Sequence, residues 1–203
     1  MMRASSALRN VMAGALRNVM AGALRNVMAG ALHKVLAGAV LFAATTLACA
    51  AGIPSAYAPI VVEPANTAER SEFDLTPALA RARRENMRLY VYLGANDCPY
   101  CRRYEAFLEK NAAELAPHFK PYLVVDLRSS LATVARRLYI RVGAKSLPYA
   151  EFQQSIHDER ARMLVYPSVW LLDAQLKPLM QMPAGTGTFQ TVEEQLEILQ
   201  LVQ

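Results

Sequence analysis

The chain has 203 residues, of which 54% are hydrophobic, which is enough for one substantial hydrophobic core. Its formal net charge of +5 comes from the first 50 residues, which hold five Arg or Lys and no Asp or Glu. The remaining residues carry 17 basic and 17 acidic side chains. The basic character is therefore confined to the amino-terminal segment, and no nucleic-acid partner is expected.

Residues 1–50 predict a signal peptide that contains an internal repeat. The octapeptide ALRNVMAG occurs three times within residues 7–30, and ALHKVLAG follows at 31–38. A unit of eight residues keeps no constant apolar face on a helix, so the repeat does not predict a solenoid. The apolar run 39–51 is short for a membrane span, and Ala48 and Ala50 form a small-residue cleavage pattern. We expect a periplasmic or secreted protein after cleavage.

The start and the end of this leader each allow an alternative. Translation from Met28 would give a compact signal peptide, and the upstream repeats would then be an expanded or mis-assigned leader. Ala56-Tyr57-Ala58 offers a second cleavage pattern. Either cleavage discards Cys49, whereas a lipoprotein signal ending at Ala48 would make Cys49 a lipid anchor.

After the leader, residues 51–72 are rich in Ala, Pro and small polar residues and predict a linker with a short strand at 59–63. Residues 73–203 predict one α/β domain. Apolar periodicity, capping residues and turn residues predict helices near 76–87, 104–115, 131–140 and 189–202, and strands at 89–93, 121–127, 168–173 and 178–182. Parallel strands joined by helices and finished by an antiparallel pair predict a central mixed β-sheet flanked by helices.

Two of the three cysteines lie in the sequence Cys98-Pro99-Tyr100-Cys101, between a predicted strand and a predicted helix. The unpaired N–H groups and partial positive charge of a helix N-terminus stabilise a thiolate on the first cysteine. The second cysteine lies one turn further on, close enough to form a disulfide. Pro99 fits the first helical turn, where its missing N–H has no cost. This arrangement predicts Cys98 as the nucleophile and Cys101 as the resolving thiol.

Charged neighbours should modulate this site. Arg102 and Arg103 add positive charge that favours the Cys98 thiolate, and Asp97 opposes it. A structural zinc site usually needs four Cys or His ligands, and after the leader only His118 and His157 could join the two cysteines. A bridge across so short a loop would also stabilise the fold little. Neither a metal nor an organic cofactor is expected.

The CPYC sequence after a strand, together with Tyr166-Pro167-Ser168 opening a later strand, resembles the thioredoxin superfamily over roughly residues 73–202. With its leader, the chain is similar to exported, periplasmic thioredoxin-like proteins. The resemblance implies a thioredoxin fold in which Pro167 is a cis-proline facing the disulfide. It also implies that Tyr166 contacts an extended substrate, with Pro99 and Tyr100 as further substrate-binding residues.

Several departures from the family pattern limit this resemblance. Thioredoxins usually have Trp before the first cysteine, where this chain has Asp97. They also keep a buried acid in the preceding strand that helps the resolving cysteine lose its proton, and Tyr92 stands at the matching position. The glutathione contacts usual in glutaredoxins are replaced by Val165-Tyr166 and Gly185-Thr186-Gly187, so glutathione binding is not expected.

The spacing between the motif and the proline predicts an insert. From Cys98 to Pro167 the chain advances 69 residues, where one helix, one strand and one helix need about 45. We place the insert at about 141–163, with a short helix through Phe152 and Ile156. It either borders the active site and shapes partner choice, or it is a packing elaboration at the sheet edge.

Together these features predict an exported, monomeric thiol-disulfide oxidoreductase that acts on protein disulfides. A reductase is favoured over an oxidase, and in an oxidising compartment it would need a membrane electron donor. The alternative is a redox-inactive thioredoxin-like module that binds an extended peptide or assists metallation of another protein.

Overall fold

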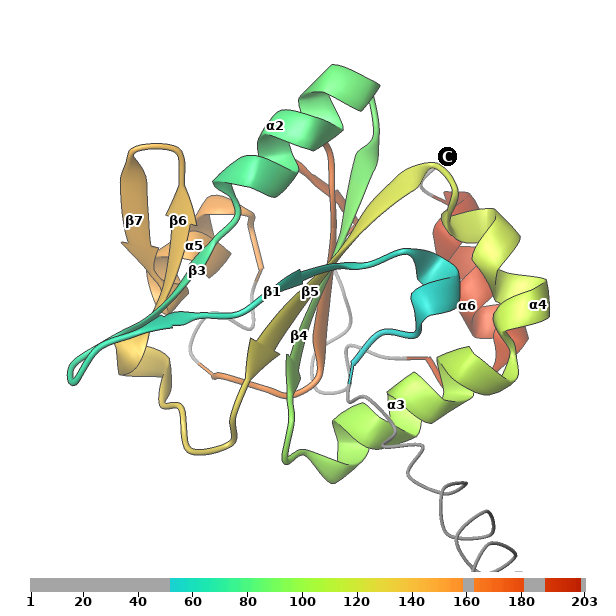
Figure 1. Ribbon diagram of the computed structural model, residues 1–203. Coiled ribbons are helices and arrows are strands. Elements are labelled where there is room, and N and C mark those ends of the chain that lie inside the picture. The colour runs from blue at the N-terminus through green and yellow to red at the C-terminus, as the bar shows by residue number, and fades with distance from the viewer. Residues whose placement is uncertain (1–51, 159–162, 181–188, 202–203) are drawn as a thin grey trace, which may run out of the picture. The chain divides into compact units, whose positions relative to one another are not determined.

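The computed structural model describes residues 52–158, 163–180 and 189–201 (Figure 1). The predicted leader, its repeats and Cys49 lie outside this range, as does the Gly185–Gly187 loop. Within the described ranges, no helix combines the length and the apolar character that a membrane span requires.

A five-stranded mixed sheet forms the centre of the domain, in the order β1-β5-β4-β8-β9. Strand β5 is parallel to both of its neighbours, β1 and β4. Strand β8 runs antiparallel to β4, and β9 runs antiparallel to β8. Its strands are β1 (Ile60–Val62), β4 (Arg88–Ala95), β5 (Tyr122–Ser129), β8 (Ser168–Leu172) and β9 (Pro178–Met180). The predicted mixed sheet and all four predicted strands of the domain are confirmed. The nearly continuous apolar runs of β4 and β5 are explained because both faces of the sheet are covered.

Helices pack on both faces of this sheet (Figure 1). On one face, α2 (Thr76–Glu85) buries Ala78, Leu79 and Ala82. The other face is covered by α3 (Pro99–Lys110), α4 (Ala112–Leu115) and α6 (Val192–Leu201), which bury Tyr104, Leu108, Leu115 and Leu199, with the short 3-10 helix Ala116–Phe119 between them. The fold is therefore α/β, with the mixed sheet flanked by helices as predicted.

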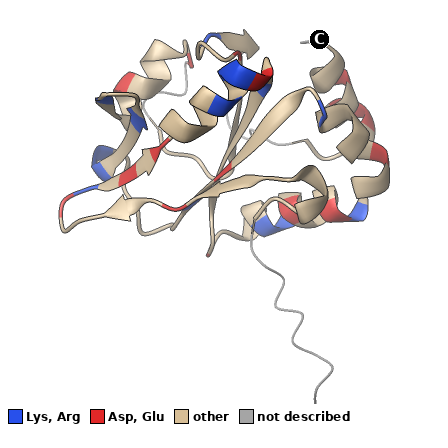
Figure 2. Cartoon of the chain, turned by 45° about the horizontal axis from the view of Figure 1, so that its top comes forward, with Lys and Arg blue, Asp and Glu red and all other residues tan. Residues whose placement is uncertain are grey.

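The charges of the helices are interspersed rather than gathered in one patch (Figure 2). On α2, for example, Arg81 forms an i,i+4 ion pair with Glu85, with 3.0 Å between Nε and Oε2. Exposed pairs of this kind contribute little stability but leave no large field of one sign. This distribution matches the zero net charge of the sequence after residue 50.

A second, four-stranded sheet lies beside the first, and it corrects one prediction. The helix predicted over 131–140 is wrong, because this segment holds a turn, the 3-10 helix Ala135–Arg137 and the start of a strand. The strand that begins at Leu138 pairs in parallel with the strand that begins at Ser71, 67 residues earlier in the sequence. Pairing between such distant segments overrides the local helix propensity. The sheet contains β2 (Ala65–Asn66), β3 (Ser71–Asp74), β6 (Leu138–Val142) and β7 (Lys145–Pro148), in that order.

Residues 141–158, the described part of the predicted insert, belong to the folded domain. The short helix α5 (Tyr149–Ser155) is present as predicted, although Ile156 lies just beyond its end. Phe152 packs against Trp170 with ring centroids 5.6 Å apart, and the Trp170 indole donates a hydrogen bond of 2.8 Å to Asp158. Residues 141–158 therefore belong to the second sheet and the core, which favours the packing interpretation for them.

The segment predicted as a linker is part of the folded domain, which corrects the boundary at residue 73. It contains the 3-10 helix Ser55–Tyr57, strands β1 and β2, and the first residues of β3. The Ile53 amide donates to Asp126 Oδ2 at 2.9 Å, and the Tyr57 hydroxyl donates to the Leu108 carbonyl at 2.9 Å. The side chains of Ile53 and Tyr57 are buried in the core on the α3 face of the sheet. Cleavage after Ala50 leaves this packing intact, whereas cleavage after Ala58 removes it.

We predict that a chain beginning at Ala51 is more stable than one beginning at Pro59. Removing Ile53 and Tyr57 exposes apolar surface and leaves the buried Asp126 carboxylate without its amide donor, at a cost of about 3 kcal/mol. Urea denaturation of the two purified chains measures the difference. Equal free energies of unfolding would show that the segment adds nothing to the fold.

Candidate active site

The two cysteines lie at the junction of β4 and α3. Strand β4 ends at Ala95, and the Cys98 amide donates to the Ala95 carbonyl at 3.0 Å, which closes a tight turn. Cys98 is the N-cap of α3, and its sulfur accepts the Cys101 amide at 3.3 Å. An N-cap side chain accepts a helix N–H that no carbonyl can reach, and a negatively charged acceptor is favoured there by the helix dipole. The backbone therefore directs a helix N–H at the Cys98 sulfur.

The two sulfurs differ in environment. Both are free thiols in this structure, and Cys101 is fully buried. The Ala95 amide donates to Cys101 Sγ at 3.4 Å. Burial, reinforced by the neighbouring Cys98 sulfur, raises the pKa of the Cys101 thiol to about 12. Cys101 therefore retains its proton, and Cys98 lies at the helix N-terminus. The roles of Cys98 as nucleophile and Cys101 as resolving thiol stay predictions.

The Tyr166–Pro167 segment lies directly beside the cysteines, as the sequence predicts. Its peptide bond is cis. The Cys98 thiol donates to the Tyr166 carbonyl with 3.8 Å between the sulfur and the oxygen. Tyr166 also packs against the cluster of Ala95, Cys98 and Cys101, and its hydroxyl hydrogen-bonds Ser129 Oγ at 2.7 Å. Cys98 is only 2% exposed beneath these contacts, so Tyr166 limits the access of a substrate to the sulfur.

The charged residues near the motif make contacts that the sequence did not predict. Asp97 Oδ1 accepts the Leu131 amide at 2.8 Å and so anchors the loop after β5 beside the cysteines. Arg102 donates to the Asn96 carbonyl at 3.3 Å. The Arg103 guanidinium lies 5.7 Å from the centroid of the Tyr100 ring. Their effect on the Cys98 thiolate stays a prediction, since these contacts run to other groups.

The residues between the cysteines differ in their exposure. Pro99 occupies the first position of α3, where its missing N–H has no cost, as predicted. The Tyr100 side chain is 66% exposed, which leaves an aromatic surface beside the motif. The substrate-binding role of Pro99 and Tyr100 stays a prediction.

Sequence reasoning missed two residues of the site. Ser129 lies at the end of β5 in register with Ala95, next to the turn that carries the cysteines. Glu105 accepts the Tyr92 hydroxyl at 2.9 Å and lies four residues after Cys101. Residues four apart share one face of a helix, so this spacing could have identified Glu105 from the sequence.

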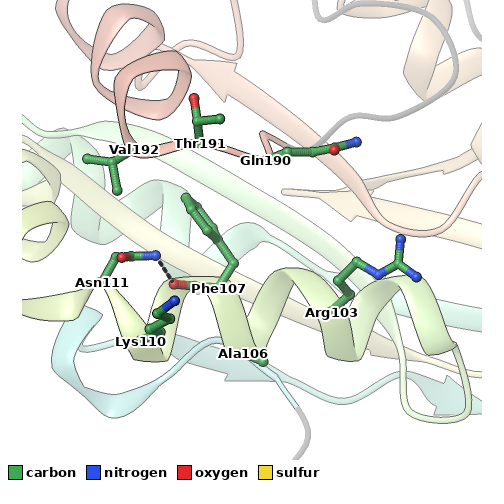
Figure 3. A pocket seen from close by; sticks show the side chains of 8 residues that line it. All are labelled: Arg103, Ala106, Phe107, Lys110, Asn111, Gln190, Thr191 and Val192. Carbon is green, nitrogen blue, oxygen red and sulfur yellow. Dashed lines mark hydrogen bonds between the residues drawn. The ribbon is translucent and has the colours of Figure 1, made fainter.

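An open hollow of about 470 Å³ lies along a different part of α3 (Figure 3). Its walls come from α3 and from the residues that lead into α6: Arg103, Ala106, Phe107, Lys110, Asn111, Gln190, Thr191 and Val192. None of these residues is a cysteine, histidine or carboxylate. The candidate active site is therefore the cysteine pair and not this hollow.

Comparison with known proteins adds no relative to this picture. Searches against protein-family models, curated proteins and solved structures found no match. Among residues 52–158, 163–180 and 189–201, no three His, Cys, Asp or Glu side chains lie together as a set of metal ligands.

We predict that Tyr166→Ala makes Cys98 more reactive. Removing the side chain that packs against the cluster of Ala95, Cys98 and Cys101 should raise the rate of alkylation by iodoacetamide about tenfold, since reactivity follows the access and the charge of the thiol. The measurement uses a Cys101→Ser background and mass spectrometry, so that a single thiol reacts. Tyr166→Phe, which keeps the ring and loses only the hydrogen bond to Ser129, is the control with a smaller change. Equal rates in all three proteins would show that Tyr166 does not limit access.

Proposed function

We propose that this protein is an exported thiol-disulfide oxidoreductase with a thioredoxin-like fold that acts on protein disulfides. The observation that carries the proposal is the N-cap position of Cys98, whose sulfur accepts the Cys101 amide at 3.3 Å. The fold is compatible with it, because the motif follows central strand β4 and Pro167 precedes β8, the antiparallel neighbour of β4. Export is inferred from the leader of residues 1–50.

The reaction proceeds by two exchanges at sulfur. The Cys98 thiolate attacks one sulfur of a substrate disulfide, and the other substrate sulfur leaves as a thiolate that takes up a proton. The Cys101 sulfur, on losing its proton, attacks Cys98 Sγ. A Cys98–Cys101 disulfide forms, and the second substrate thiolate leaves. Two electrons pass from the protein to the substrate, and a membrane electron donor returns two electrons to the cysteines. In the opposite direction, the same steps oxidise a dithiol.

The substrate is an extended segment that carries the reacting sulfur. The resemblance to thioredoxins implies that such a segment pairs with the backbone of Tyr166. The Tyr166 carbonyl lies 3.8 Å from Cys98 Sγ. A segment paired at Tyr166 would therefore hold its disulfide close to the nucleophile, which lowers the entropic cost of the attack.

The second candidate is a redox-inactive module that holds an extended peptide beside Pro167. The low exposure of Cys98 favours it, because a covered sulfur reacts slowly. The exposed ring of Tyr100 would offer contact surface to either type of client.

We predict that Cys98→Ser lowers the rate of insulin disulfide reduction by about 100-fold or more, because a serine hydroxyl does not replace a thiolate nucleophile. The assay follows insulin reduction with dithiothreitol as the electron donor and the chain from Ala51 as the enzyme. Cys101→Ser should instead accumulate a covalent mixed disulfide between Cys98 and the substrate, visible by mass spectrometry without reductant.

Circular dichroism of each variant provides the control for folding. Undiminished reduction by Cys98→Ser, or the absence of a mixed disulfide in Cys101→Ser, would contradict the oxidoreductase and favour the binding module.

A further inference from the structure

One face of helix α3 joins the cysteine motif to the open hollow of Figure 3. At intervals of three, four and three residues, this face carries Tyr100, Arg103, Phe107 and Lys110. Residues at these intervals lie on the same side of a helix. The Arg103 guanidinium, which lines the hollow, lies 5.7 Å from the centroid of the exposed Tyr100 ring. The hollow therefore begins beside the motif.

The aromatic centre of the hollow is held in place by the core. Phe107 is half-buried, and its ring stacks on that of buried Tyr104 with 6.1 Å between the centroids. Figure 3 shows the Phe107 side chain pointing from α3 toward residues 190–192, with Arg103 and Lys110 on either side of it along the helix. An aromatic ring thus lies between two cations.

The opposite wall is fixed by the start of α6. The Glu194 amide donates to Thr191 Oγ1 at 3.2 Å, and Glu194 Oε2 accepts the amides of Gln190 at 3.0 Å and Thr191 at 3.2 Å. These reciprocal bonds form a capping box, which occupies the Glu194 carboxylate with backbone amides. The wall itself consists of Gln190, Thr191 and Val192, which carry no charge.

The charge of the hollow differs from that of the rest of the domain. Residues 51–203 have equal numbers of acidic and basic side chains, which are interspersed over the helices (Figure 2). The walls of the hollow contain Arg103 and Lys110 and no carboxylate. Two cations on either side of an aromatic ring favour a ligand that carries negative charge at two points with an apolar part between them.

The carboxylates nearest in the sequence do not neutralise these cations. Glu105 and Glu109 follow Arg103 and Phe107 by two residues, a spacing that places them on other sides of the helix. Across the part of the chain that the structure describes, neither Arg103 nor Lys110 forms an ion pair with a carboxylate. Both cations are therefore available to an acidic ligand.

We propose that the hollow binds an acidic segment of the client protein while Cys98 attacks the client's disulfide, so that disulfides flanked by Asp or Glu are preferred. This inference rests on the proposed oxidoreductase function and names the class of client. The client's carboxylates pair with Arg103 and Lys110, and an apolar side chain between them packs on Phe107.

The position of the hollow determines where the acidic residues of a client lie. Arg103 and Lys110 follow Cys98 by 5 and 12 residues. These separations are about 7.5 Å and about 18 Å along the helix axis. An extended client advances about 3.3 Å per residue. Its carboxylates therefore lie roughly two and roughly six residues from the reacting cysteine, on one side of it.

Two pairs of synthetic peptides test this preference. Each peptide has one disulfide-closed loop and one arm, which precedes the loop in one pair and follows it in the other. The arm residues roughly two and roughly six positions from the loop are Glu in one member of a pair and Gln in the other. In the pair whose arm reaches the hollow, the reduced chain from Ala51 should reduce the Glu peptide about tenfold faster at low salt. At about 1 M salt, where the Debye length is about 3 Å, the two rates should converge.

Substitution of both cations should abolish the preference. In the double variant Arg103→Gln with Lys110→Gln, the ratio of the Glu rate to the Gln rate should fall to about one. The ratio is the readout because both peptides react at the same sulfur, so any effect of Arg103 on the Cys98 thiolate cancels. The matched control is Arg84→Gln with Lys120→Gln, which removes one exposed arginine and one exposed lysine outside the hollow and should keep the ratio.

Equal rates for the Glu and Gln peptides of both pairs at low salt would overturn the proposal, and so would a preference that the double variant retains. Sedimentation of the unmodified chain tests a second copy as the occupant. A dimer that the double variant disperses would assign the hollow to self-association and overturn the proposal. If the unmodified protein reduces none of the peptides, the proposed oxidoreductase function fails, and this inference with it.

Discussion

The hydrogen bond from the Cys101 amide to the Cys98 sulfur is the contact on which the rest of the site depends. It places a sulfur where helices usually carry a hydroxyl or carboxylate cap, and so directs the positive end of α3 at the Cys98 sulfur. Its geometry depends on β4, which is buried on both faces and ends two residues before Asp97. Buried Tyr104 and Leu108 fix α3 on the sheet, and Asp97 ties the turn to the next loop.

The two sulfurs beside this contact have different surroundings. Cys98 meets the helix terminus and the Tyr166 carbonyl, whereas Cys101 lies on the core side among Ala95 and Tyr92. Such asymmetry suits a two-step exchange, because one thiol must be charged before substrate arrives and the other only after the mixed disulfide has formed. Burial, and after it the neighbouring Cys98 sulfur, raise the pKa of the Cys101 thiol.

The elements that hold the cysteines could be predicted from the sequence, because their signals are local. The β-branched and aromatic run of β4, the proline after Cys98 and the helical spacing of Tyr104 and Leu108 each act within a few residues. The second sheet could not be predicted, since α2, β4, α3 and β5 lie between β3 and β6 in the sequence, and no local signal shows that the two strands pair. The role of Asp97 was missed because its acceptor bond joins it to the distant Leu131 amide. Glu105 carried a signal in its spacing from Cys101, whereas its contact with the Tyr92 hydroxyl joins two different elements, α3 and β4.

The most direct measurement is the reduction potential of the Cys98–Cys101 couple in the chain from Ala51, equilibrated with dithiothreitol or glutathione buffers. The account predicts one reversible two-electron couple with a potential near that of thioredoxin, about −270 mV. A potential near −120 mV would contradict the reductase direction. Failure of the two sulfurs to form an intramolecular disulfide at any potential would contradict the oxidoreductase altogether.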